Sequence, residues 1–219
     1  MLIKSPKNRA ALSLAASFIV ILTTAKSLLT FFTGFGSGNM YITGAECFKY
    51  FTVDSNILAA LCCSVLIPYA LKALSGSGEY ILPRFALRLK LTGTAAVTVT
   101  MLTVIFFLGP VQGYGYMYIG DNLWLHLINP LICEVSFILL EAGEMKKRDA
   151  LYGMLPTLVY GIIYLIMVVV IGESKGGWRD FYGFNAGGMW PVSFAAMLAA
   201  TLIISYGLYA LRRLCMNRK

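Results

Sequence analysis

The residues best suited to catalysis lie near the start of one apolar stretch. Thr52, Ser55 and Asn56 follow helical spacing, so an α-helix places them on one face, and Asp54 falls on another side of that helix. A threonine hydroxyl is a weak nucleophile until a base removes its proton. A neighbouring side-chain amide can donate hydrogen bonds to an oxyanion that forms on the substrate. This face therefore favours a nucleophile, Thr52, beside an oxyanion donor, Asn56.

A second polar set surrounds the only histidine of the chain. His126, Asn129 and Glu134 recur at helical intervals and form one polar stripe. A neutral imidazole can accept a proton from a threonine hydroxyl and later pass it to the leaving group. Asn129 is a second candidate oxyanion donor, and Glu134 and Asp54 are candidates for orienting the imidazole. The pattern is typical of a nucleophile and base supplied by two different helices.

Lys26 lies toward the end of the first apolar stretch, and we expect it in one layer with Thr52 and His126. These polar residues could also have purely structural roles instead of catalytic ones. Ser, Thr and Asn in membrane helices commonly join neighbouring helices by hydrogen bonds. Lys26 and Asp54 are close enough to a helix end to extend into the polar interface.

Six apolar stretches must position these residues. Hydrophobic residues make up 58% of the 219 residues, charged residues only 13%, and the mean hydropathy is +0.74, whereas soluble domains are nearer half apolar and a quarter charged. Each stretch is about 20 residues long, enough to cross a hydrocarbon core as a helix. We therefore predict an all-α fold and a single domain over residues 1–219. The predicted spans are 10–32, 50–71, 91–108, 123–140, 151–171 and 190–211.

The basic residues predict the orientation. Most of the 18 Lys and Arg residues lie in the N-terminal segment, the second and fourth connections, and the C-terminal tail. Cytoplasmic connections carry this excess, so we predict a multi-pass protein of the cell membrane with both termini cytoplasmic. The net charge of +8 then reflects topology, and we expect no nucleic-acid partner. No Cys and His spacing typical of a metal site is present, so we predict no metal.

Aromatic residues are concentrated in the predicted outer connections. They include Tyr114, Tyr116, Trp124, Trp178 and Tyr182. Amphipathic rings suit the membrane–water interface, so we interpret these residues as interface anchors rather than as a binding site.

Two segments carry a family resemblance. Phe51-Thr52-x-x-Ser55-Asn56 and Leu125-His126-x-x-x-Pro130 resemble a group of uncharacterised bacterial six-pass membrane proteins. More distantly, they are similar to the androgen-induced and androgen-dependent membrane proteins of animals, which are threonine hydrolases of fatty acid esters of hydroxy fatty acids. The resemblance implies that Thr52 and His126 form the catalytic pair. It also implies a lipid ester substrate and no metal or organic cofactor.

The leading hypothesis is an intramembrane threonine hydrolase of lipid esters, an enzyme of lipid metabolism, with its site near the outer leaflet. The alternative is a non-enzymatic bundle (a small transporter, a lipid-binding protein or a sensor) in which the same polar residues line a path or pocket. The chain shows no obvious internal repeat, which argues against a transporter. A structural subunit of a larger complex is a third hypothesis. The sequence leaves the oligomeric state open.

Overall fold

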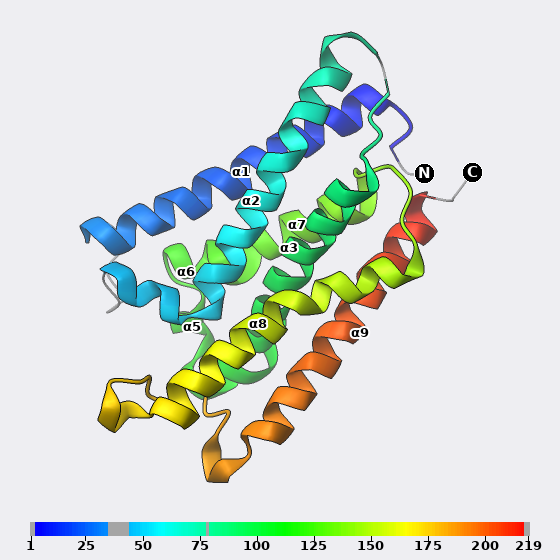
Figure 1. Cartoon of the computed structure of the whole chain (residues 1–219). Coiled ribbons are helices and arrows are strands. Elements are labelled where there is room, and N and C mark those ends of the chain that lie inside the picture. Colours follow the sequence, from blue (N-terminus) through cyan, green and yellow to red (C-terminus); the bar gives the residue numbers. More distant parts are fainter. Residues whose placement is uncertain (1–2, 35–43, 78, 217–219) are drawn as a thin grey trace.

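The computed structural model describes residues 3–34, 44–77 and 79–216, and the described part is an all-α bundle without β-strands (Figure 1). It has six helical stretches that are long and apolar enough to cross a membrane. These are Pro6–Thr33, Phe51–Gly76, Arg84–Gln112, Asp121–Leu139, Lys147–Ile171 and Trp190–Met216. The predicted fold class and six spans are confirmed, with ends that differ from prediction by several residues.

Helices α1 and α9 are continuous, whereas the other spans include π-helical or 3-10 turns. The elements are α1 (Pro6–Thr33), η1 (Gly44–Lys49), α2 (Phe51–Lys72), η2 (Ala73–Ser77), α3 (Arg84–Thr103), η3 (Val104–Leu108), α4 (Gly109–Gln112), α5 (Tyr114–Met117), α6 (Asp121–Leu123), η4 (Trp124–Ile128), α7 (Asn129–Leu139), η5 (Lys147–Met154), α8 (Leu155–Tyr164), η6 (Leu165–Ile171), η7 (Glu173–Lys175), η8 (Ala186–Gly188) and α9 (Trp190–Met216). Four π-helical turns occur in the described residues: η3, η4 and η6 lie within spans, and η2 forms the end of the second span.

The ends of α1 follow from its sequence. Ser5 precedes the helix in an extended conformation, and its hydroxyl accepts a hydrogen bond of 3.3 Å from the Asn8 amide. Pro6 occupies the first turn, where no backbone donor is needed. Gly34 ends the helix with φ +71°, a conformation that glycine adopts without strain.

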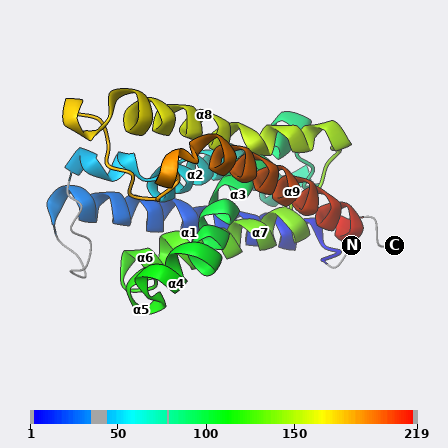
Figure 2. The same ribbon diagram turned by 90° about the horizontal axis from the view of Figure 1, so that it is seen from below.

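Helix α3 forms the core of the bundle. Every residue from 93 to 101 is buried, so this stretch is enclosed on all sides. Figure 2 shows α8 and α9 on one side of the bundle and α1 and α7 on the other, with α3 between them. Gly93 permits the contact with α2, because an added Cβ would lie only 3.0 Å from the Ala59 Cα. The central helix therefore has contacts that leave little room for larger side chains.

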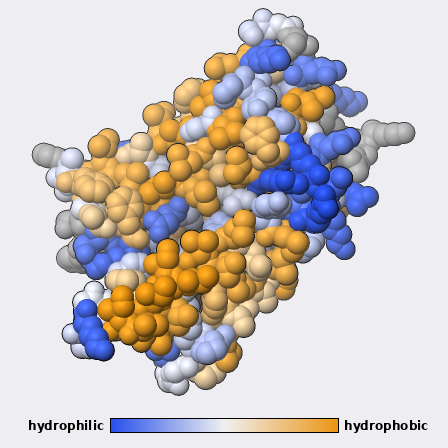
Figure 3. Space-filling view, in the orientation of Figure 1, coloured by the Kyte–Doolittle hydropathy of each residue, from blue (hydrophilic) through white to orange (hydrophobic). Residues whose placement is uncertain are grey.

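The surface between the two ends of the bundle is apolar. Figure 3 shows hydrophobic side chains over the middle of one face and hydrophilic ones toward its ends. Phe106 and Ile203, for example, are 75% and 73% exposed. Such exposure is what lipid-facing positions require. We call the end where α1 and α3 begin and α9 stops the basic end. The opposite end, where α2 and α9 begin, is the aromatic end.

Buried charges stabilise the basic end. The Asp149 carboxylate is fully buried and accepts hydrogen bonds from Arg84 (2.7 and 2.8 Å) and Arg88 (2.8 Å). Glu141, also fully buried, accepts from Ser13 at 2.8 Å and Tyr80 at 2.7 Å. The Glu141 contacts connect α1 and the segment before α3 to the connection after α7, and the Asp149 contacts connect α3 to η5.

Candidate functional site

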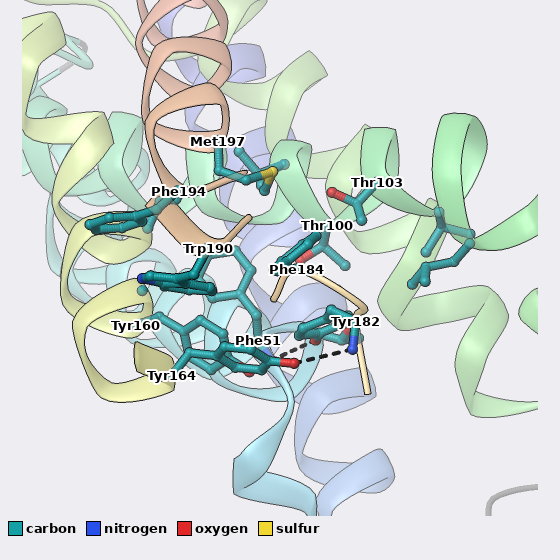
Figure 4. A pocket seen from close by; sticks show the side chains of 16 residues that line it. Phe51, Thr100, Thr103, Tyr160, Tyr164, Tyr182, Phe184, Trp190, Phe194 and Met197 are labelled. Carbon is teal, nitrogen blue, oxygen red and sulfur yellow. Dashed lines mark hydrogen bonds between the residues drawn. The ribbon is translucent and has the colours of Figure 1, made fainter. Parts of the chain in front are cut away.

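An apolar cavity lies at the aromatic end between α2, α3, α8 and α9 (Figure 4). Its enclosed volume is about 40 Å³, and the wider space not filled by atoms, which includes the open space at its mouth, is about 570 Å³. Its walls are aromatic and aliphatic side chains with a few hydroxyl groups, among them Phe51, Thr52, Thr100, Thr103, Tyr160, Tyr164, Tyr182, Phe184, Trp190, Phe194 and Met197. No charged side chain of the described residues lines it.

Helical spacing explains how the cavity walls form. Tyr160 and Tyr164 lie one turn apart on α8, and Trp190 and Phe194 lie one turn apart on α9, so each pair presents two rings to the same side. Gly161 has no side chain to keep α9 away, and a Cβ there would overlap the Phe194 ring. The glycine lets the aromatic rings of the two helices meet.

The connection before α9 folds back to complete the aromatic wall. Tyr164 stacks on Trp190 with ring centroids 5.3 Å apart, and Tyr182 stacks on Phe184 at 5.2 Å. Tyr164 is fully buried and Trp190 is 5% exposed. Trp178 and Tyr182, which the sequence predicts to be interface anchors, belong to this packed cluster. Tyr114 and Tyr116 remain exposed on the other side of the bundle.

Most tyrosine hydroxyls around the cavity have structural partners. The Tyr160 hydroxyl donates to the Lys49 carbonyl at 2.6 Å, and that of Tyr164 to Asp180 at 2.8 Å. The Tyr182 hydroxyl accepts from the Phe51 amide at 3.1 Å, and burial raises the pKa of this phenol well above its usual range. The hydroxyls of Thr52 and Thr103 are different. In the part of the chain that the structure describes, neither has a hydrogen-bond partner.

Thr52 and His126 lie in neighbouring segments but not in one pocket. Thr52 lines the cavity, whereas buried His126 does not. The Asn56 side-chain amide links their two segments, because it donates hydrogen bonds to the Thr52 carbonyl at 2.8 Å and to the Leu125 carbonyl at 3.0 Å. No hydrogen bond joins the Thr52 and His126 side chains within the described ranges. The structure thus joins the two helices through a hydrogen bond from the Asn56 side chain to the Leu125 backbone carbonyl.

The group that orients His126 is one that the sequence reasoning missed. Nδ1 of the imidazole lies 2.8 Å from the Met117 carbonyl oxygen. A carbonyl can only accept, so Nδ1 carries the proton and Nε2 is left as the basic nitrogen. Glu134, a candidate for this role, instead accepts a hydrogen bond of 2.8 Å from Thr98 on α3. His126 also lies within the π-helical turn η4, a distortion that is frequent at functional sites.

The asparagine amides are not available to an oxyanion. Asn56 uses both amide hydrogens on the two carbonyls, and Asn129 donates to Asn56 Oδ1 at 3.0 Å and to Thr24 at 3.4 Å. A side-chain amide has two hydrogens, so none remains for a substrate. In this arrangement the amides of Asn56 and Asn129 serve to join helices, and the oxyanion role stays a prediction that requires these hydrogen bonds to break. Ser55 likewise contacts α3, through a 2.9 Å hydrogen bond with Thr100.

Lys26 and Asp54 lie apart from the cavity. Lys26 forms an ion pair of 2.5 Å with Asp121, a buried carboxylate that also accepts from Ser27 at 3.2 Å. The sequence reasoning did not identify Asp121. Asp54 lines a separate groove between α2 and α8. Of the expected layer of Lys26, Thr52 and His126, Thr52 lines the cavity, and Lys26 and His126 do not.

Among the described residues, no three His, Cys, Asp or Glu side chains are grouped so that they could hold a metal ion. No family model, curated protein or solved structure matches this chain. The resemblance to six-pass membrane proteins and threonine hydrolases therefore stays a prediction.

Proposed function

We propose that the protein binds one apolar or amphiphilic molecule from the membrane in the cavity at its aromatic end. The observation that carries this proposal is the cavity itself, an uncharged and aromatic-walled space between four helices. Small-molecule sites typically have mainly apolar walls and a few polar groups. This cavity has such walls, and its enclosed volume of about 40 Å³ means that a ligand enters by moving side chains at its mouth. A hydrocarbon chain gains by leaving water or by replacing poor packing in such a space.

The two free hydroxyls indicate the polar part of the ligand. Thr52 and Thr103 enter from α2 and α3, and each can donate one hydrogen bond and accept others. No charged side chain is available to balance an ionised group. The ligand class that fits is therefore a hydrocarbon with an uncharged polar group, such as an ester or an alcohol.

Trp190 provides a direct test, because its ring is part of the cavity wall. Bromine quenches indole fluorescence at contact, so methyl 9,10-dibromostearate added to the protein in maltoside micelles should quench Trp190 saturably. Thr103→Phe should fill the cavity and abolish the saturable component. Val170→Phe, an enlargement at a position that is 67% exposed on η6, is the matched control and should leave it intact.

Trp190→Phe identifies the reporter, because the saturable component should disappear with this indole even though the ligand still binds. Quenching that rises without saturation, or that is equal in Thr103→Phe and the parent, would overturn the binding proposal. Elution of each variant as one species in gel filtration establishes that it is folded.

A threonine hydrolase is the second candidate, favoured by one observation. The Thr52 hydroxyl has no hydrogen-bond partner among the described residues and lies at the cavity wall. One turn further along α2, the Asn56 amide donates a hydrogen bond to the carbonyl of Leu125, the residue before His126. In this reaction, Thr52 Oγ1 bonds to the ester carbonyl carbon and its proton passes to His126 Nε2. The proton then goes to the departing alcohol oxygen, and water releases the acid by the same route.

This candidate requires proton transfer between Thr52 and His126 across one water or after a small rearrangement, because their side chains share no hydrogen bond. Purified protein assayed with p-nitrophenyl esters and with fatty acid esters of hydroxy fatty acids tests it. Hydrolysis should fall at least about 100-fold in both Thr52→Ala and His126→Ala. Variants that hydrolyse as well as the parent would exclude the enzyme and leave the binding proposal standing.

A further inference from the structure

A groove between α2 and α8 lies beside the cavity and is separate from it. It contains about 460 Å³ of unfilled space, open to the surroundings on one side. Its walls include Phe51, Asp54, Leu58, Val159, Tyr160 and Ile163. Val159 and Ile163 are 55% and 44% exposed, so the groove opens on the surface that faces lipid.

Asp54 gives the groove a single charge. Its carboxylate is partly buried, and no hydrogen bond or ion pair to it exists within the described ranges. The nearest basic residue along the chain, Lys49, is already paired with Glu46. An acidic group at membrane depth is costly unless it has a partner. The start of α2 supplies part of that stabilisation through the helix dipole, but a dipole does not neutralise a full charge.

Two aromatic rings stand next to this carboxylate. The rings of Phe51 and Tyr160 have centroids 5.1 Å apart and line both the groove and the cavity. They therefore form the partition between the two spaces. Ring faces attract organic cations, and ammonium groups are often recognised by aromatic side chains together with a carboxylate.

We propose that this groove binds a single-chain amphiphile with a net positive charge, an alkylamine or alkyl quaternary ammonium compound. The ammonium lies against Asp54 and the Phe51–Tyr160 rings, and the hydrocarbon chain extends along the exposed apolar sides of α2 and α8. A neutral alcohol of the same length lacks the charge. A zwitterionic phosphocholine adds a phosphate for which the groove offers no cation. This ligand class differs from the uncharged one proposed for the cavity.

The experiment measures equilibrium binding of radiolabelled dodecyltrimethylammonium to the full chain in maltoside micelles. We expect one saturable site per protein in the parent. Asp54→Asn, an uncharged side chain of the same shape, should weaken binding roughly tenfold. Glu46→Gln makes the same charge change at an exposed residue of the same end and should leave the affinity unchanged. Dodecanol and dodecylphosphocholine should compete poorly.

Binding within twofold of the parent in Asp54→Asn overturns the proposal, as does equal weakening in Glu46→Gln, which would mean a bulk charge effect. Equal competition by dodecylphosphocholine overturns the requirement for net positive charge. Thr103→Phe separates this site from the cavity, because filling the cavity should leave ammonium binding intact.

Two measurements keep the test valid if Asp54→Asn does not fold. Asp54→Glu keeps the charge and should keep the binding. In the unmodified protein, dodecyltrimethylammonium should protect Asp54 from carbodiimide modification, as read by peptide mass spectrometry. Modification of Asp54 at the same rate with and without the ligand would contradict the proposal.

Discussion

The Asn129 side-chain amide donates a 3.0 Å hydrogen bond to Asn56 Oδ1 and so joins α7 to α2 in the interior of the bundle. Asn129 also connects to α1, because its Oδ1 accepts from Thr23 at 2.8 Å. Both asparagines are completely buried. Within lipid, such interhelical hydrogen bonds replace contacts that no solvent can supply.

Asn56→Ala should destabilise the protein by about 1 kcal/mol, because the Leu125 carbonyl and the Asn129 amide both lose a partner. Unfolding in mixed micelles of increasing dodecyl sulfate content measures the effect. Ser64→Ala is the control, since this exposed hydroxyl bonds only to its own helix, at the Ala60 carbonyl. A loss of stability no larger than in Ser64→Ala would show that the network adds nothing.

Asp149→Ala should cost about 2 kcal/mol, less than the ~3–5 kcal/mol typical of breaking a fully buried pair. The reason for the smaller value is that Arg84 and Arg88 are 27% and 28% exposed and regain some hydration. The same dodecyl sulfate titration measures it. Glu144→Ala, at an exposed acid in the connection just before η5, should be neutral. Equal effects of the two substitutions would contradict the role of Asp149.

Glu141 should make stability fall as pH rises. Burial raises its pKa above the ordinary value of 4.5, against the opposing effects of Lys90 and of hydrogen bonds from Tyr80 and Ser13. Arg9 also faces this cluster, and Arg212 binds the Glu141 carbonyl. Between the ordinary and the raised pKa, the folded state binds more protons than the unfolded state. Stability attributable to this group is therefore present at low pH and declines across that window.

Glu141→Gln removes the titration and keeps hydrogen-bonding atoms in place. From pH 4.5 upward, the thermal unfolding temperature of this variant should decline less than that of the parent. Parallel declines in the two proteins would assign the pH dependence to other groups.

The basic end should face the cytoplasm. Four of the five cysteines are buried, so Cys215→Ser provides a background with little labelling. In that background, Lys175→Cys at the aromatic end should react with a membrane-impermeant maleimide on intact cells. Lys147→Cys at the basic end should react only after permeabilisation, because Lys and Arg are retained on the cytoplasmic side. The reverse pattern would invert the topology.

The six spans could be predicted because their signal is additive over about 20 residues, and local boundary errors do not change it. The environment of Lys90 could not be predicted in this way. Counted as a charge of the second connection, it is in fact 1% exposed, and its ammonium donates to the Cys63 sulfur at 3.2 Å. Only the packing of α2 against α3 places that sulfur there.

The cavity was beyond sequence reasoning for a similar reason. Tyr164 was visible as an aromatic residue within a span, but its partner Asp180 lies 16 residues further on, in a connection that folds back. The shared face of Thr52, Ser55 and Asn56 was a periodicity argument and did not reveal that the Asn56 amide is occupied by two backbone carbonyls. Sequence periodicity predicts which side of a helix a side chain is on. Whether its hydrogen-bonding atoms already have partners depends on the neighbouring helices packed against that side.

The π-helical turns η3, η4 and η6 have a consequence for aligning this chain with homologues. A π-helical turn holds one residue more than the regular helix around it, so a deletion there restores ordinary winding without moving the distant parts of the span. A deletion at Leu127 or Ile128 would also leave one residue fewer between His126 and Asn129 and so change the angle between these two side chains around the helix axis. Homologues that differ in length at these three turns can therefore share a bundle yet present different side chains at the aromatic end, and alignment register needs to be checked there first.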